Sequence, residues 1–138
     1  MATSIEAKIV NALLAEFATV TLPAGVKVAQ PNVTFTPDGT NPYVRLSIAK
    51  NTPKGFISGD REPIRMGFLL AVVCWPVGQG IVKPSELAGT IRDVFKFNTK
   101  VNREGIELRV SDEPAVKSDM QAAGYVEIPV VIPWAQYP

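Results

Sequence analysis

The sequence predicts an α+β fold in which two helices pack on one face of a mixed, mainly antiparallel β-sheet. Three observations predict it. Apolar residues recur every three or four positions in two separate segments, which is typical of helices. A long apolar run, Ile64–Trp75, lies between them and has the character of a buried strand. The length of 138 residues is enough for one hydrophobic core, and we expect a single domain over residues 1–138.

The first helix is predicted near the N-terminus. Its apolar stripe consists of Ile5, Ile9, Val10, Leu13, Leu14 and Phe17. Thr3 and Glu6 have the spacing of a capping box, in which each side chain accepts a hydrogen bond from a free backbone N–H. Pro23 and Gly25 follow the stripe, so we expect the helix to end before them.

Two strands and a long connection are predicted next. Val26–Ala29 can form a short strand that ends at Pro31, and Tyr43–Ile48 alternates between apolar and polar residues as a half-buried strand does. Ala49–Pro63 has no periodicity and contains two prolines and two glycines. We interpret it as a long loop or an extended hairpin tip, and loops of this length often carry function.

The strand Ile64–Trp75 is apolar on both of its faces. Ile64, Met66, Phe68, Leu70, Val72 and Cys74 share one face, and Leu69, Ala71, Val73 and Trp75 share the other. We therefore expect helices to cover one face and another subunit to cover the other. The run is too short for a membrane span, which needs about 20 apolar residues, so we expect no membrane partner.

The remaining elements follow a tight turn at Gly78 and Gly80. A second helix is predicted to begin around Pro84 and to end near Phe97, with Leu87, Ile91, Val94 and Phe95 as its stripe. Gly105–Val110 and Tyr125–Trp134 are predicted strands. Pro129 and Pro133 cannot donate ladder hydrogen bonds, which favours an edge position for the last strand.

The composition excludes several kinds of catalytic site. The chain has no histidine and one cysteine, Cys74, so His-based nucleophile systems and thiolate or imidazole metal clusters are excluded. "GQGIVKPS" lacks the spacing of a phosphate-binding loop. We expect no enzymatic activity, no cofactor and no metal, and we interpret Cys74 as a buried small hydrophobic residue. The formal net charge of +1 also disfavours a dedicated nucleic-acid binder.

The candidate partner-binding residues lie in and beside the long connection. Basic side chains are in modest excess there and can contact an acidic protein surface or nucleic acid, although they can equally serve only to keep a loop soluble. The candidates are Lys50, Lys54, Asp60, Arg61, Glu62 and Arg65. A second region, Ser111–Ala123, contains Asp112, Glu113 and Asp119, which we interpret as solvated loop charges and as the next most plausible binding surface.

The pattern as a whole resembles the tail terminator proteins of long-tailed bacteriophages. The resemblance covers residues 5–134 and is carried by "IRMGFLLAVVCWPVGQG", an Arg-x-Gly strand start before a Gly-x-Gly turn, and by "LAGTIRDVFKF", a helix ending in phenylalanines. It implies a structural virion protein, a minor tail protein, that forms a ring, typically a homohexamer, at the head-proximal end of the tail. Such a ring caps the tail tube, stops its polymerisation and offers a docking surface to the head-tail connector.

The same resemblance implies that the ring assembles in the host cytoplasm and that genomic DNA passes through it without sequence-specific binding. Two alternatives remain at this stage. One is another virion part, a tail-tube or head-to-tail joining protein. The other is a small ligand-binding or enzymatic α+β domain that uses loop carboxylates, with Arg45 or Arg65 as an anion anchor.

Overall fold

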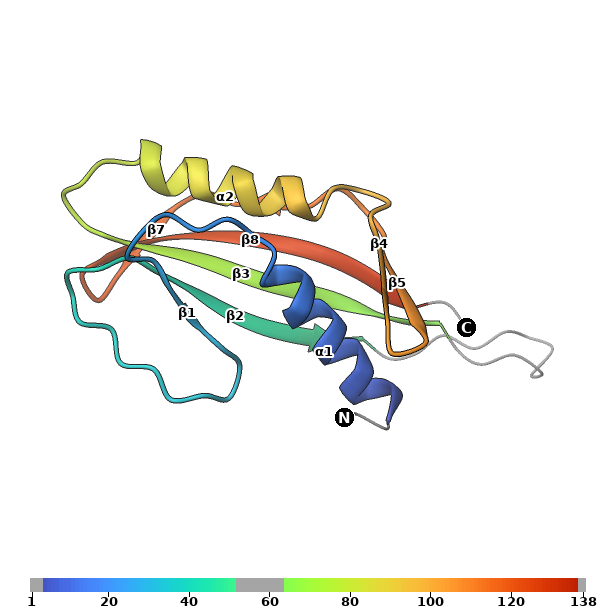
Figure 1. The fold of residues 1–138 in the computed structure, drawn as a ribbon. Coiled ribbons are helices and arrows are strands. Elements are labelled where there is room, and N and C mark those ends of the chain that lie inside the picture. The colour runs from blue at the N-terminus through green and yellow to red at the C-terminus, as the bar shows by residue number, and fades with distance from the viewer. Residues whose placement is uncertain (1–3, 52–63, 137–138) are drawn as a thin grey trace.

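The structure, a computed structural model, describes residues 4–51 and 64–136 (Figure 1). Two helices and eight strands occupy these residues. The elements are α1 (Ile5–Phe17), β1 (Lys27–Ala29), β2 (Tyr43–Lys50), β3 (Arg65–Pro76), α2 (Val82–Val94), β4 (Lys100–Arg103), β5 (Ile106–Val110), β6 (Ala115–Val116), β7 (Met120–Ala122) and β8 (Tyr125–Gln136). None of the helices in the described residues is long and apolar enough to cross a membrane.

Helix α1 forms where its apolar stripe predicts it, but its N-cap differs from the prediction. Ser4 is the capping residue, and its Oγ accepts a hydrogen bond from the backbone N–H of Ala7 at 3.2 Å. The predicted cap, Thr3, lies outside the described residues, and a cap at Ser4 places Ala7 rather than Glu6 at the third helical position. The buried face consists of Ile9, Ala12, Leu13 and Phe17.

Helix α2 is shifted toward the N-terminus relative to the prediction. It begins at Val82, so Pro84 lies in the first turn, where a missing N–H costs no intrahelical hydrogen bond. It ends at Val94, and Phe95 follows as a buried C-cap residue that is 1% exposed. Leu87, Ala88 and Ile91 complete its buried face.

The sheet has the order β1-β2-β3-β8-β5-β4, and β6 and β7 also pair with β8. Among the strands of the described residues, β1 and β2 pair in parallel and all other pairings are antiparallel. Both helices lie over the same face (Figure 1), and their buried residues form one apolar cluster with Leu69, Ala71 and Val73 of β3 and Ile128, Val130 and Ile132 of β8. The α+β prediction with two helices on one face of a mixed, mainly antiparallel sheet is confirmed. We call this face the inner face and the opposite one the outer face.

The prediction that the last strand is an edge is wrong. Strand β8 pairs with β3 along its whole length, and its other side pairs in turn with β7, β6 and β5. Pro133 lies between the β5 and β6 pairings, and Pro129 between the β6 and β7 pairings. Both prolines still accept hydrogen bonds through their carbonyls, from Ser111 N at 3.1 Å and Lys117 N at 2.8 Å. The missing N–H groups therefore fall on the side where the neighbouring strand is interrupted, which is how a central strand tolerates two prolines.

Strands β2 and β3 form the two arms of an antiparallel hairpin. Their register runs from Tyr43↔Cys74 to Lys50↔Gly67, and the N–H of Asn51 donates to the carbonyl of Met66 at 2.8 Å. The predicted loop Ala49–Pro63 is therefore shorter than expected at its first end, because Ala49 and Lys50 belong to β2. Its residues 52–63 lie outside the described residues.

Three short strands, β4, β6 and β7, were not predicted. Strands β4 and β5 are joined by Glu104–Gly105, and β7 and β8 by Ala123–Gly124. All four of these turn residues have positive φ, between 50° and 83°. This is the geometry of a two-residue hairpin turn whose twist matches that of the strands.

Segment 30–42 covers one end of the outer face. The Phe35 ring lies 4.9 Å from the Tyr43 ring, which lies 5.2 Å from the Tyr125 ring in an edge-on arrangement. The Tyr125 hydroxyl accepts a hydrogen bond from Gly39 N at 2.9 Å and donates one to the carbonyl of Asn41 at 3.3 Å. The segment is thus held by a residue of the last strand.

The turn inside this segment is organised by Asp38. Its Oδ1 accepts hydrogen bonds from the backbone N–H groups of Thr40 and Asn41, both at 2.9 Å. These bonds stabilise the charged carboxylate and hold the pKa of Asp38 well below its usual range. The turn therefore keeps its shape at any pH near neutrality.

Gly67 permits a close approach at the centre of the sheet. A Cβ at this position would overlap the backbone carbonyl oxygen of Ala49 and lie 2.9 Å from Cζ2 of Trp134. Trp134 is 1% exposed and pairs with Gly67 across β3 and β8. The missing side chain thus lets the indole ring lie directly against β3.

We predict that Gly67→Ala lowers the free energy of unfolding by about 3 kcal/mol, because the added methyl group overlaps the Ala49 carbonyl, which cannot move without disturbing the β2–β3 ladder. Gly89→Ala in α2 is the matched control, since a Cβ there meets nothing within 4 Å. That variant should gain about 0.5–1 kcal/mol from helix propensity. Urea denaturation of both variants measures the difference, and equal stabilities would contradict the packing assigned to Gly67.

We also predict that Tyr125→Phe loosens segment 30–42. The variant removes the acceptor of the Gly39 N–H and a donor to the Asn41 carbonyl while keeping the ring, which should cost about 1–2 kcal/mol locally. Hydrogen exchange read by mass spectrometry should show faster exchange in residues 30–42 and unchanged exchange in β3. Unchanged exchange in the segment would show that the hydroxyl does not hold it.

Candidate functional site

The uncovered part of the outer face is the clearest candidate for a protein contact. Phe68 of β3 is 38% exposed, and Leu70, Val131 and Pro133 are half-buried around it. The register joins them, with Phe68 opposite Pro133 and Leu70 opposite Val131. We call these four residues the outer patch. Another subunit covering the outer face stays a prediction, and it can concern only this part, because segment 30–42 of the chain itself covers the other end.

An ion pair lies between the outer patch and segment 30–42. Arg45 of β2 donates from both terminal guanidinium nitrogens to the two carboxylate oxygens of Glu127 in β8, each at 3.3 Å. The Glu127 side chain is 14% exposed, whereas that of Arg45 is 47% exposed. The bidentate arrangement neutralises the two charges on this part of the face, so Arg45 has a carboxylate partner already and is a poor candidate for the anion anchor considered from the sequence.

Cys74 lies beneath this ion pair and is fully buried. Burial raises the pKa of its thiol, and its Sγ lies 3.7 Å from the carbonyl oxygen of Val72. Burial likewise raises the pKa of the neighbouring Tyr43 to about 12. A buried, protonated thiol fits the interpretation of Cys74 as a small hydrophobic residue.

The predicted partner-binding residues divide into two groups. Lys50, at the end of β2, and Arg65, at the start of β3, lie at the same end of the hairpin arms. Lys50 is exposed, whereas Arg65 is half-buried and its Nε lies 3.6 Å from Oε1 of Glu6 in α1. The other predicted residues, Lys54, Asp60, Arg61 and Glu62, lie outside the described residues.

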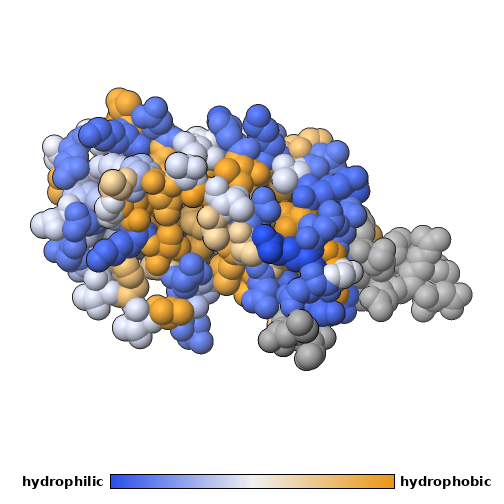
Figure 2. All heavy atoms as spheres, in the orientation of Figure 1, coloured by the Kyte–Doolittle hydropathy of each residue, from blue (hydrophilic) through white to orange (hydrophobic). Residues whose placement is uncertain are grey.

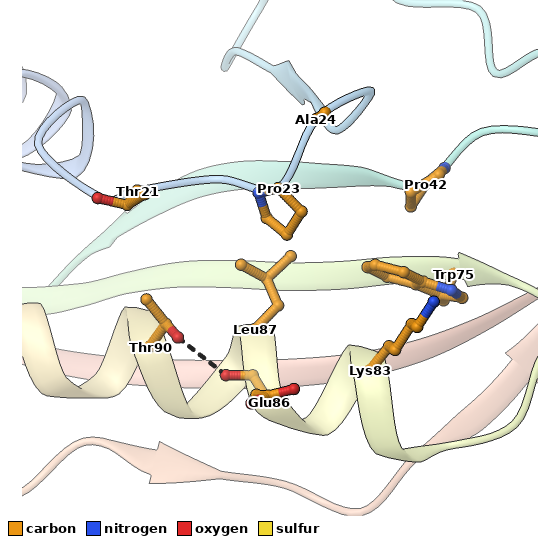
Figure 3. Close-up of a pocket in the computed structure, with 9 residues that line it drawn as sticks. All are labelled: Thr21, Pro23, Ala24, Pro42, Trp75, Lys83, Glu86, Leu87 and Thr90. Atoms are coloured by element: carbon orange, nitrogen blue, oxygen red, sulfur yellow. Dashed lines mark hydrogen bonds between the residues drawn. The ribbon is translucent and has the colours of Figure 1, made fainter.

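A groove lies on the other side of the molecule, between α2 and the segment that joins α1 to β1. Figure 2 shows apolar side chains exposed on this face. The groove has a volume of about 520 Å³ and is drawn in Figure 3 with its lining residues Thr21, Pro23, Ala24, Pro42, Trp75, Lys83, Glu86, Leu87 and Thr90.

The chemistry of this groove is that of a shallow apolar contact. In Figure 3 the Lys83 side chain extends toward Trp75, and the Thr90 hydroxyl donates to the backbone carbonyl of Glu86 at 3.0 Å rather than into the groove. The Trp75 indole N–H donates to Gln79 at 3.2 Å. Two of its polar groups, the Thr90 hydroxyl and the Trp75 indole N–H, are thus engaged within the chain, and the apolar part of the lining can hold an apolar side chain.

The described carboxylates among those singled out in the sequence are exposed to solvent. The described residues contain no group of three or more His, Cys, Asp or Glu side chains that could hold a metal ion. Asp112, Glu113 and Asp119 are exposed, and Asp112 Oδ1 accepts a hydrogen bond from the backbone N–H of Glu113 at 2.8 Å. This supports their interpretation as solvated loop charges.

The outer patch was not predicted as one surface from the sequence. The sequence pattern placed Phe68 and Leu70 on one face of a strand, but it did not pair them with Val131 and Pro133. The available signal was the alternation in the last strand, where Glu127, Pro129, Val131 and Pro133 share the face opposite to Ile128, Val130 and Ile132. That alternation was obscured because the two prolines suggested an edge.

Comparison with known proteins identifies the family. A family model described as phage tail terminator protein matches residues 8–134, which is almost the whole chain. No curated protein sequence matches the chain.

The fold also occurs among solved structures. One of them has a TM-score of 0.64 and 21% sequence identity, and the alignment covers 97% of this chain and 95% of that chain. At this identity the likeness concerns the fold alone. The family match is independent of it and favours a tail terminator over the other virion parts considered from the sequence, so the chain belongs to the phage tail terminator family and is a structural component of the phage tail.

Proposed function

We propose that the chain forms a hexameric ring that caps the tail tube at the head-proximal end, stops its polymerisation and provides the docking surface for the head-tail connector. The ring assembles in the host cytoplasm from subunits that each form one domain over residues 1–138. Genomic DNA passes through it without sequence-specific contacts. The protein acts by contact and not by catalysis.

The outer patch is the observation that carries this proposal. Four apolar side chains lie at the middle of a sheet face whose other end is covered by the chain itself. Burying one large apolar side chain contributes about 1.5–3 kcal/mol, so a contiguous group of them favours association strongly. A central exposed apolar group is typical of a protein–protein contact, and in a family of tail components a second copy or a tail protein is its natural partner.

The hairpin end of the sheet supplies a second surface in this proposal. Lys50 is the last residue of β2 and Arg65 is the first residue of β3, so in the sequence they flank segment 52–63. We assign Lys50, Lys54, Asp60, Arg61, Glu62 and Arg65 to this docking surface, and the excess of basic over acidic side chains among them suits an acidic rim on the tail tube or the connector. Complementary charge at such a rim mainly accelerates association and fixes orientation.

We predict that the protein self-associates into a closed ring at high concentration or on purified tail tubes. Sedimentation velocity measures the first case, and electron microscopy of capped tubes measures the second. Tubes polymerised in the presence of the protein should stop at a defined length. A strict monomer that leaves tube length unchanged in both settings would refute the proposed function.

We predict further that the double variant Lys54→Glu/Arg61→Glu keeps its thermal midpoint within a few degrees but impairs capping. Exposed substitutions usually cost no more than about 0.5 kcal/mol, whereas reversed charges repel an acidic rim. Arg92→Glu/Lys96→Glu, in and just after the last turn of α2, changes the net charge equally and serves as the control, since both side chains are exposed and belong to none of the proposed surfaces. Equal loss of capping in both variants would attribute the effect to net charge alone.

A further inference from the structure

The turn between β3 and α2 exposes an unusual amount of aliphatic surface. Val77 is 45% exposed, Ile81 43% and Val82 73%. No charged residue occurs between Val77 and Val82. Single exposed apolar residues are common on protein surfaces, but three within six residues form a small continuous surface. We call these three residues the apolar turn.

The apolar turn is held in place by the elements around it. The N–H of Val77 donates to the carbonyl of Gly124 at 3.1 Å, and the N–H of Ser85 donates to the carbonyl of Ile81 at 3.1 Å. The Trp75 side chain holds Gln79 through the hydrogen bond described above. Gly78 and Gly80, with φ of 88° and 84°, allow the sharp reversal. Because the turn is ordered before any contact, little conformational entropy is lost when its side chains are covered.

The apolar turn and the outer patch cannot meet within one chain. In Figure 1 the turn lies at the end of β3 opposite to the end at which β2 and β3 are connected. Phe68 and Val77 are nine residues apart along an extended strand, which corresponds to about 30 Å. Within the described residues, neither surface can therefore cover the other in the same chain.

We propose that the apolar turn of one copy packs on the outer patch of the next copy. Two different surfaces, one beside the first half of β3 and one beyond its end, make a heterologous, head-to-tail contact, and such a contact can repeat around a ring. Neither surface contains a charged side chain, and the nearby Arg45 and Glu127 neutralise each other. Lys83, which follows Val82, is exposed and long enough to keep its ammonium group in water beside the contact. This inference rests on the proposed ring and names the two surfaces that build it.

Mixed disulfide cross-linking tests the contact directly. The variants Val82→Cys and Phe68→Cys are purified separately, mixed under conditions of assembly and oxidised mildly. The native Cys74 stays in place, because it is fully buried, and the wild-type protein serves as the control. The mixture should give a cross-linked dimer, whereas each variant alone should give no more dimer than wild type. A double variant should give a ladder of larger species that ends at the ring.

Charge insertion provides a second measurement. Val82→Asp and Phe68→Asp should each weaken self-association about tenfold or more, since a carboxylate would be buried in an apolar contact. Their thermal midpoints report folding separately. Phe97→Asp is the control, because Phe97 is 58% exposed and belongs to neither surface, and it should leave association unchanged.

The outcomes separate this inference from the proposed function. A ring that forms without the mixed cross-link, or that weakens equally in Phe97→Asp, overturns the assigned surfaces but leaves the ring. Dimers from Val82→Cys alone or Phe68→Cys alone, at the yield of the mixture, replace the head-to-tail contact with a symmetric one. No self-association of the wild-type protein, alone or on tubes, refutes both proposals.

Discussion

The pairing of β3 with β8 is the constraint on which the rest of the structure depends. The two strands are in register from Arg65↔Gln136 to Pro76↔Tyr125, and each residue faces either the helices or the outer face. A slip of one residue would exchange the two faces and move apolar side chains such as Leu69 and Ile132 away from the helices. Gly67 opposes such a slip, because Trp134 fits against β3 only where no side chain intervenes.

Much of this arrangement could be predicted from periodicity. The stripes of α1 and α2 and the two-sided apolar run of β3 indicated the elements that build the core, and their order implied an α+β fold. The edge prediction for β8 failed because proline removes a donor from only one side of a strand. Sequence alone does not tell whether that side faces solvent or, as at Pro129 and Pro133, a break between partner segments.

The candidate site could be predicted only in part, for a related reason. The alternation in Ile64–Trp75 indicated two covered faces, but within the described residues segment 30–42 covers only one end of the outer face. One end is covered through hydrogen bonds between Tyr125 and the backbone near Gly39, residues separated by most of the chain. Contacts of that range leave no local pattern in a sequence. Lys50 and Arg65 were recognised from composition. The ion-pair partner of Arg65 is Glu6 of α1, and the sequence does not show that α1 packs beside the start of β3.

The interrupted side of β8 also affects how the protein can change over evolutionary time. Strand β3 pairs with β8 without a break, so an insertion in either strand would shift every residue pair beyond it. On the opposite side, β5, β6 and β7 bond to β8 as three separate pieces, joined by residues 111–114 and 117–119. Insertions or deletions in those two connecting segments can leave the register of β3 and β8 unchanged. One flank of the sheet is therefore fixed in length, whereas the other can be remodelled piece by piece as a tail protein adapts to new neighbours.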